Sequence, residues 1–235
     1  MPAMRLDKLL SEATAFTRSK LKQMIKSGRV TVNGAVITSP EHKLEPENAR
    51  VCVDGAPVKY SRFHYFMLNK PAGLLSATDD RKQKTVIDLF PPELRPRLFP
   101  VGRLDRDTTG LLLVTDDGDF AHRVISPRSE IVKTYRAVTA EPVSDGDISA
   151  FSRGIVLADG TKCLPAGLEK CPDGSCLVHV MEGKYHLVKR MLASRGKPVI
   201  ELKRLQIGGL KLDETLAEGE FRQLIEDELC SVIKK

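Results

Sequence analysis

The sequence predicts an α+β protein in two unequal parts. Two short amphipathic helices and an Asn-Gly hairpin fill the smaller part, residues 1–57, which closes on the turn-forming run Asp54-Gly55-Ala56-Pro57. Residues 58–64 are expected to form a linker. In the larger part, residues 65–235, short apolar runs separated by turns outnumber helical stretches. This pattern predicts a mixed, largely antiparallel β-sheet with flanking helices.

The smaller part begins with two helices whose apolar residues recur every three or four positions. The apolar side of the first helix is formed by Leu6, Leu9, Leu10 and Ala13. Thr17 is a good N-cap for the second helix and Gly28 a good C-terminal stop. The apolar side of this second helix is formed by Leu21, Met24 and Ile25. Residues 30–37 then indicate two short strands around Asn33-Gly34, a pair typical of tight hairpins.

Positive charge is concentrated on the second helix. The chain has a net charge of +6, and its first 30 residues hold seven Lys or Arg against two Asp or Glu. Arg18, Lys22 and Lys26 are four residues apart, so they share one side of the helix, and Arg29 follows its end. Because like charges at this spacing destabilise a helix, we expect this basic side to contact the phosphates of a polyanion. A solvated basic surface is the alternative that charge alone leaves open.

The larger part is expected to alternate strands with a few helices. An apolar run at 65–68 predicts its first strand. Further strands are expected at 110–115, 131–140, 175–182 and 199–207. Helices are expected at 118–125, 185–195 and 225–233.

The cysteines and the length of the apolar runs predict the protein's location. The chain has five cysteines, an odd number at irregular spacing, which favours a reducing cytoplasm over a disulfide framework. The group Cys163, Cys171, Cys176 and His179 matches no common zinc spacing, so we expect no metal. No apolar run approaches the roughly 20 residues of a membrane helix. The N-terminus lacks the apolar core of a signal peptide, so we expect no membrane association.

A polar loop precedes the most apolar run of the chain. Leu111 to Val114 predicts a buried strand, and the preceding residues 103–109 include two aspartates, two arginines and two threonines. Loops held by a rigid strand often carry function. Asp105 and Asp107 could form a general acid and base pair of glycosidase type, or could cap backbone N–H groups in a turn. The residues by themselves leave both interpretations open.

Several segments resemble known families. The segment "RLDKLL…TRSKLKQMIKSGRVTVNG", between Met4 and about Val53, resembles the S4 RNA-binding module. The run "GRLDRDTTGLLLVTDDG" resembles the catalytic motif of RNA pseudouridine synthases, in the branch that carries an N-terminal S4 module. Matching segments follow in order: "FMLNKPAG" (66–73), "KTYRAV" (133–138), "EGKYHLVKRM" (182–191) and "GEFRQL" (219–224). The resemblance covers essentially the whole chain, with one departure, because Leu187 stands where the family usually has Gln.

The resemblance implies a role for each site residue. Asp105 would be the catalytic carboxylate, Tyr135 would stack on the target uracil, and Lys189 would pair with Asp105. Arg103 and Leu104 would contact the substrate, with Arg103 filling the space left by the extruded base. Taken alone, the residues favour a half-buried strand tyrosine for Tyr135 and a solvated helix lysine for Lys189. The reaction is an isomerisation, so no cofactor is expected.

The resemblance is strongest to the branch that acts on 16S rRNA. It implies isomerisation of uridine to pseudouridine at the position conventionally numbered 516, by a monomer acting on 16S rRNA or on a 30S assembly intermediate. A 23S rRNA target is the alternative within the same class. A non-catalytic S4-type RNA-binding factor in ribosome assembly is the alternative of another class.

Overall fold

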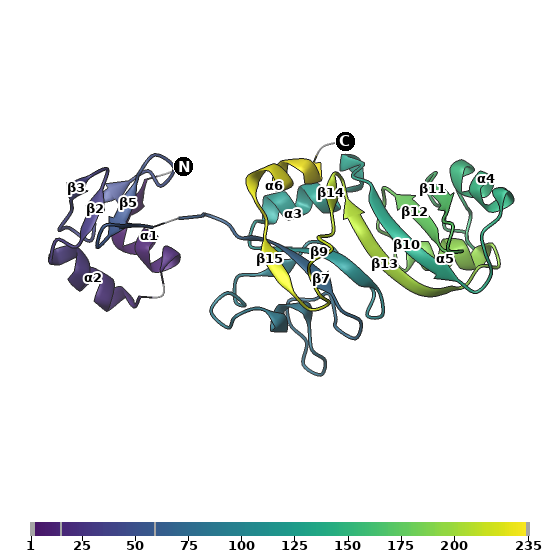
Figure 1. The fold of residues 1–235 in the computed structure, drawn as a ribbon, viewed down its shortest axis with the longest axis horizontal. Coiled ribbons are helices and arrows are strands. Elements are labelled where there is room, and N and C mark those ends of the chain that lie inside the picture. Colours follow the sequence, from purple (N-terminus) through teal and green to yellow (C-terminus); the bar gives the residue numbers. More distant parts are fainter. Residues whose placement is uncertain (1–2, 15, 59, 234–235) are drawn as a thin grey trace. The chain divides into compact units, whose positions relative to one another are not determined.

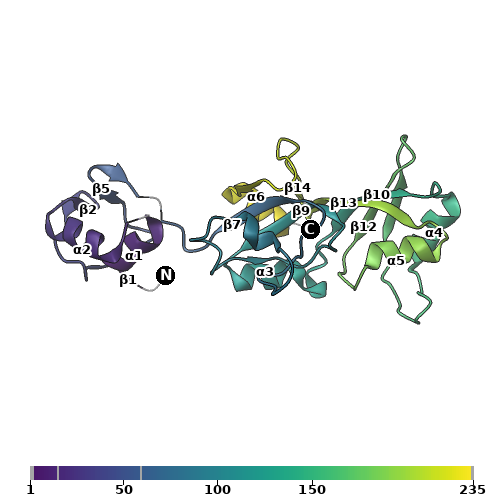
Figure 2. The same cartoon turned by 90° about the horizontal axis from the view of Figure 1, so that it is seen from below.

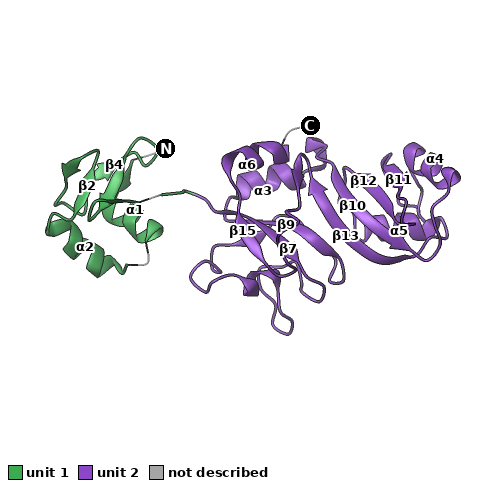
Figure 3. Ribbon diagram, in the orientation of Figure 1, with its two compact units in different colours: residues 1–62 green, residues 63–235 purple. Residues whose placement is uncertain are grey.

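The computed structural model describes residues 3–14, 16–58 and 60–233. It divides the chain into two compact units, Met1–Arg62 and Phe63–Lys235 (Figure 3). The division falls within the segment 58–64 that was expected to be a linker, of which Lys59 lies outside the described residues. Each unit has its own hydrophobic core and is described by itself.

The first unit packs two helices on a small sheet (Figure 1). Its helices are α1 (Leu6–Ala13) and α2 (Arg18–Lys26), and their predicted apolar residues other than Ala13, which is only partly buried, form the core with β2 and β5. The strands of its larger sheet are β3 (Ala35–Val36), β2 (Val30–Val32), β5 (Val51–Val53) and β6 (Ala56–Pro57), in that spatial order. A separate pair joins β1 (Met4–Arg5) to β4 (Lys43–Leu44).

Local signals in the first unit are confirmed. The Thr17 hydroxyl caps α2 by accepting a hydrogen bond from the Lys20 N–H. Asn33 and Gly34 both have positive φ, at 52° and 85°, as a tight hairpin between β2 and β3 requires.

The second unit is built on a nine-stranded sheet. The strands along its main path are β11 (Gly167–Lys170), β12 (Cys176–Val180), β10 (Lys133–Thr139), β13 (Val199–Ile207), β9 (Thr109–Thr115), β7 (Tyr65–Lys70) and β15 (Phe221–Gln223). Two short strands lie off this path: β14 (Leu210–Lys211) pairs with β13 and β8 (Phe99–Pro100) with β9. Only the β13–β9 pairing is parallel among the described strands, so the predicted mixed, largely antiparallel sheet is confirmed.

Helices cover this sheet in two groups (Figures 1 and 2). α3 (Gly118–Ile125) and α6 (Glu226–Ile233) share one core with β7 and β9. α4 (Asp145–Arg153) and α5 (Leu187–Ser194) share another with β10, β11 and β12. Two 3₁₀ turns, η1 (Val86–Leu89) and η2 (Pro127–Ser129), complete the unit. No helix of the described residues is long and apolar enough to cross a membrane.

The run of four apolar residues in β9, Leu111 to Val114, is explained by the burial of this strand on both faces. Leu111 and Leu113 point into the core beneath α3 and α6, while Leu112 and Val114 point into the core of η1 on the opposite face. A strand buried on both faces reads as a continuous apolar run.

The parallel β9–β13 pair depends on a glycine at its start. Gly110 has φ of 98°, and a Cβ there would lie 2.3 Å from the carbonyl oxygen of Arg204 on β13. Gly110 therefore allows the two backbones to approach closely. Since Tyr135 of β10 pairs with Arg204 in turn, the start of β9 is aligned with Tyr135 across the sheet.

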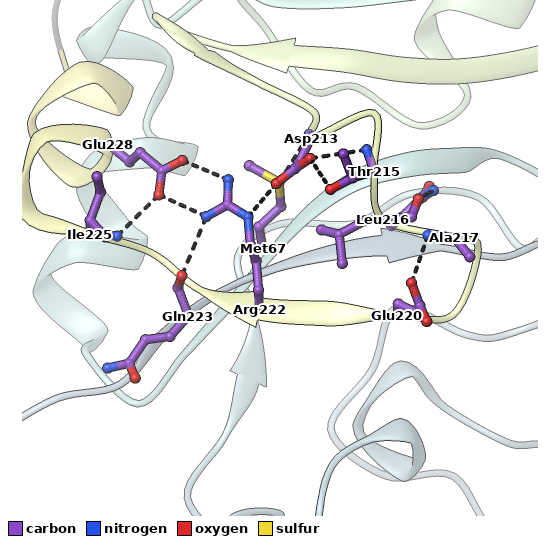
Figure 4. Close-up of polar contacts among 11 residues, drawn as sticks. Met67, Asp213, Thr215, Leu216, Ala217, Glu220, Arg222, Gln223, Ile225 and Glu228 are labelled. Carbon is purple, nitrogen blue, oxygen red and sulfur yellow. Dashed lines mark hydrogen bonds and ion pairs between the residues drawn. The ribbon is translucent and has the colours of Figure 1, made fainter.

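The "GEFRQL" segment has a structural role (Figure 4). The Arg222 guanidinium of β15 donates to Asp213 at 2.6 Å and to both carboxylate oxygens of Glu228, at 2.9 and 2.7 Å. This arginine therefore ties the loop after β14 and helix α6 to the last strand of the sheet.

Candidate active site

A buried lysine holds the polar loop that precedes β9. The Nζ atom of Lys70, at the end of β7, donates to the carbonyl oxygens of Pro71, Arg106 and Thr108 at 3.0, 3.2 and 3.0 Å. The side chain is completely buried, and this burial lowers its pKa to about 8 against the opposing attraction of Asp107 and Asp105. Lys70 lies in the "FMLNKPAG" segment, but its burial was not foreseen.

A second set of hydrogen bonds fixes the loop on either side of Asp105. The Ser76 hydroxyl accepts from the Leu104 N–H at 3.0 Å and donates to the Leu104 carbonyl at 2.9 Å. Gly73 and Arg106 are joined by two further bonds, at 2.7 and 3.1 Å. The Thr108 N–H donates to the main-chain carbonyl of Asp105, which closes a turn. The backbone that carries Asp105 is therefore anchored at both of its neighbours.

The Asp105 carboxylate faces two basic side chains at the start of α5. Its Oδ2 lies 3.5 Å from Lys189 Nζ, and its Oδ1 lies 3.4 Å from His186 Nε2. A quarter of the Asp105 side chain remains exposed. Lys189 also contacts Asp107 at 2.5 Å, and this bond lowers the pKa of the Asp107 carboxyl. One cation therefore bridges the two aspartates of the loop, and its shorter contact is to Asp107.

The start of α5 places these basic groups. His186 has φ of 47°, a left-handed conformation, so the helix expected from residue 185 begins only at Leu187. The apolar side of the helix, formed by Leu187, Val188, Met191 and Leu192, is buried against the sheet. Lys189 is thereby left on the side of Asp105. Leu187 lines the pocket with an apolar side chain.

Tyr135 is half-buried on β10 beside a buried arginine of β13. Arg204 Cζ lies 5.9 Å from the centre of the Tyr135 ring, and its Nη1 lies 3.4 Å from the tyrosine hydroxyl. The same guanidinium donates from Nε to the Leu111 carbonyl at 2.7 Å. Neither Arg204 nor His186 was expected at the site.

One pocket brings together all five site residues predicted in the larger unit. Its lining includes Arg103, Leu104, Asp105, Tyr135 and Lys189. Leu187 and Leu202 add apolar surface beside the Tyr135 ring. A carboxylate next to a cation, an aromatic ring and apolar walls suits a flat, polar base attached to a sugar. Across residues 3–14, 16–58 and 60–233, no three His, Cys, Asp or Glu side chains gather closely enough to hold a metal ion.

The predicted basic residues of the first unit are all exposed. Arg18, Lys22 and Lys26 lie along one exposed side of α2, next to the side formed by its buried apolar residues. Arg29 differs from them because its guanidinium donates twice to the Asp54 carboxylate, at 2.7 and 2.5 Å. The arginine lowers the pKa of the Asp54 carboxyl in return. No ion pair within 4.0 Å joins the three α2 residues to another described residue.

Both units match known protein families. The S4 domain family matches residues 4–51, and the RNA pseudouridylate synthase family matches residues 64–194. The chain is 43% identical to ribosomal small subunit pseudouridine synthase A of Salmonella typhimurium, over 97% of this chain and 100% of the relative. It is 44% identical to YtzG, an uncharacterized RNA pseudouridine synthase of Bacillus subtilis, over 96% of this chain and 97% of that protein.

A solved structure described as a pseudouridylate synthase has the same architecture. It matches with a TM-score of 0.70 and 37% identity, over 97% of this chain and 99% of the solved one. The resemblance found in the motifs is therefore confirmed over the whole length. The chain belongs to the RNA pseudouridine synthase family and carries an S4 domain ahead of its catalytic domain.

Proposed function

We propose that this enzyme converts uridine to pseudouridine in small-subunit rRNA, at the uridine numbered 516 in 16S rRNA, with Asp105 as its catalytic carboxylate. The observation that carries the role of Asp105 is its position 3.5 Å from Lys189 in the pocket that Tyr135 also lines. The choice of rRNA is supported by relatives named ribosomal small subunit pseudouridine synthase A, which are 42–43% identical over their full lengths.

The chemistry needs a carboxylate next to the ribose of the target. The bond between C1′ and N1 breaks, the uracil turns, and a bond forms between C1′ and C5, while the proton leaves C5 and N1 gains one. Asp105 would attack C1′ or remove a nearby proton, and either step needs its ionised form. The Lys189 ammonium lies 3.5 Å from this carboxylate and places a positive charge beside it. Atoms and electrons balance without a co-reactant.

The target uridine has to leave its stack to reach Asp105. The Tyr135 ring would offer a face on which the uracil stacks, and Leu187 and Leu202 would offer apolar contacts in the same pocket. Arg103 is exposed next to the anchored Leu104, and it would fill the space that the base leaves in the RNA.

The S4 domain would hold the RNA by its phosphates. Arg18, Lys22 and Lys26 are exposed on one side of α2 and form no ion pair with another described residue, while the charge of Arg29 is shared with Asp54. Such contacts add affinity without reading sequence. We propose a monomer that acts in the cytoplasm on 16S rRNA or a 30S assembly intermediate.

The test is Asp105→Asn, assayed for pseudouridine on a 16S rRNA fragment that contains uridine 516. We expect the product to disappear while the Kd for the fragment stays close to that of the wild type. Asp119→Asn, an equal loss of charge at an exposed position of α3, is the control and should retain activity. Full activity of Asp105→Asn would refute the proposed role.

The target is tested separately by mapping pseudouridine in cells that lack the gene. Loss of the 16S site is expected. Loss of a site in 23S rRNA would support the alternative target, and an unchanged map would support a non-catalytic role in ribosome assembly.

A further inference from the structure

A second cavity adjoins the active-site pocket and shares Tyr135 with it. It has a volume of about 480 Å³, and Arg103, Tyr135 and Glu182 line it as well as the active-site pocket. Asp105 and Lys189 do not line it. The cavity is therefore next to the reacting centre without being part of it.

Arg204 lines this second cavity and has a donor without a partner among the described residues. Only 4% of the residue is exposed, and its Nε and Nη1 atoms are engaged by the Leu111 carbonyl and the Tyr135 hydroxyl. Its Nη2 atom is buried and has no hydrogen-bond partner among the described residues. A buried donor without a partner costs free energy, which an acceptor in the cavity would recover.

The charges around the cavity favour an occupant rich in acceptors. Lys133 also lines it and donates to the Val124 carbonyl at 3.3 Å, and burial with the nearby Arg204 charge lowers the pKa of Lys133 to about 8. The Glu182 carboxylate is already engaged by Lys184 at 2.7 Å and by the Leu164 N–H at 2.8 Å. The cavity thus offers hydrogen-bond donors, while the Glu182 carboxylate that lines it is already bonded to other groups.

The remaining walls fit a flat ring. Val101, Val124, Ile125 and Ile207 give the cavity an apolar lining, next to the aromatic ring of Tyr135. Nucleobases combine an apolar face with acceptors on their edges. With the target uridine in the adjoining active-site pocket, the nearest such group is the base of a neighbouring nucleotide in the same RNA strand.

We propose that the second cavity binds the base of a nucleotide next to the target uridine, and that Arg204 Nη2 donates to an acceptor on the edge of that base. This inference rests on the proposed RNA modification and adds a contact that selects the RNA around the target. Arg204 also positions Tyr135, and because Tyr135 lines both cavities, the second base and the target uridine would both lie next to this tyrosine.

The test combines changes in the RNA with changes in the cavity. Fragments with an abasic nucleotide on the 5′ side or on the 3′ side of the target are compared with the unmodified fragment. Ile125→Trp fills the cavity from an exposed position, since 49% of Ile125 is accessible, so the core is not disturbed. Ile225→Trp, the same change at an isoleucine that is 63% exposed and lines neither cavity, is the matched control.

We expect one abasic substitution to lower kcat/KM of the wild type and of Ile225→Trp by roughly tenfold, the effect of a hydrogen bond to a charged donor. For Ile125→Trp we expect kcat/KM with unmodified RNA to be roughly tenfold lower than for the wild type. The abasic fragment should cause no further decrease in this variant. Arg204→Lys, whose thermal unfolding shows whether it folds, should behave in the same way as Ile125→Trp.

Two results would overturn the inference. In the first, neither abasic fragment lowers kcat/KM of the wild type. In the second, an abasic fragment lowers kcat/KM of the wild type and of Ile125→Trp by the same factor. Failure of the proposed target is a different result, because the wild type would then form no pseudouridine on the 16S fragment. In that case the same comparison, made on the RNA that the enzyme does modify, still decides what the second cavity binds.

Discussion

The Nζ atom of Lys70 lies 3.0 Å from the carbonyl oxygen of Thr108, and this bond joins the end of β7 to the end of the loop that carries Asp105. Two more carbonyl oxygens, those of Pro71 and Arg106, accept from the same ammonium. An irregular loop lacks the regular backbone hydrogen bonds of a strand or helix. Here one buried side chain supplies hydrogen bonds to the loop instead, and the bonded residues Arg106 and Thr108 lie within three positions of Asp105.

Lys70→Met should lower both stability and turnover. The methionine fills the space but leaves three carbonyl oxygens without their donor, and a broken buried charge interaction costs about 3 kcal/mol. We expect a lower Tm and a fall in kcat with little change in KM, because the loop still forms part of the pocket but holds Asp105 less firmly. Thermal unfolding and steady-state kinetics measure the two effects. An unchanged Tm would show that the carbonyl oxygens find other donors.

Lys189→Met tests the cation beside Asp105. Removing the charge leaves both Asp105 and Asp107 without their nearest ammonium, so we expect kcat to fall by about 100-fold, a loss typical of a positioned charged group. Lys189→Arg, which retains the charge, should recover part of this loss.

A surface lysine provides the matched control for Lys189→Met. Lys170 contacts the exposed Asp145 at 2.6 Å, and an exposed pair of this kind contributes little. Lys170→Met should therefore leave kcat unchanged. Equal activity of Lys189→Met and Lys170→Met would remove Lys189 from the mechanism.

Local patterns predicted most elements, and long-range pairing explains most of the features that were missed. The Thr17 cap and the Asn33-Gly34 hairpin act within a few residues, so the sequence reports them directly. α4 is an exception, because it was missed although Ser144 and Asp147 form a capping box at its start, which is a local signal for a helix.

The site was predicted less completely than the fold, for a physical reason. The five predicted residues lie in long motifs and line one pocket. Lys70 and Arg204 were missed because a charged residue in a strand is normally exposed. Their burial follows from cross-strand neighbours, such as the pairing of Arg204 with Tyr135, which no local pattern reports.

Arg222→Met should destabilise the second unit in a manner that depends on pH. The Thr215 and Arg222 contacts hold the pKa of Asp213 at about 2, and Arg222 lowers the pKa of Glu228. Carboxyl groups with lowered pKa values stabilise the fold above their unfolded pKa near 4, and this stabilisation is lost as the pH falls towards 2. The difference in Tm between wild type and variant should therefore be largest near pH 7 and shrink between pH 4 and 2. A difference that is constant with pH would assign the role of Arg222 to packing alone.

Replacing Arg18, Lys22 and Lys26 together by glutamine should weaken RNA binding and flatten its dependence on salt. Removal of one phosphate-binding charge reduces the slope of log Kd against log salt by about 0.7–0.9, so removal of three should reduce it by about 2 to 3. Arg29→Gln should change the slope less than any one of the three, because Asp54 already neutralises its guanidinium. Titrations of a 16S fragment at several salt concentrations measure these slopes. If the triple variant kept the wild-type slope, the exposed side of α2 would be a solvated surface and the phosphates would bind elsewhere.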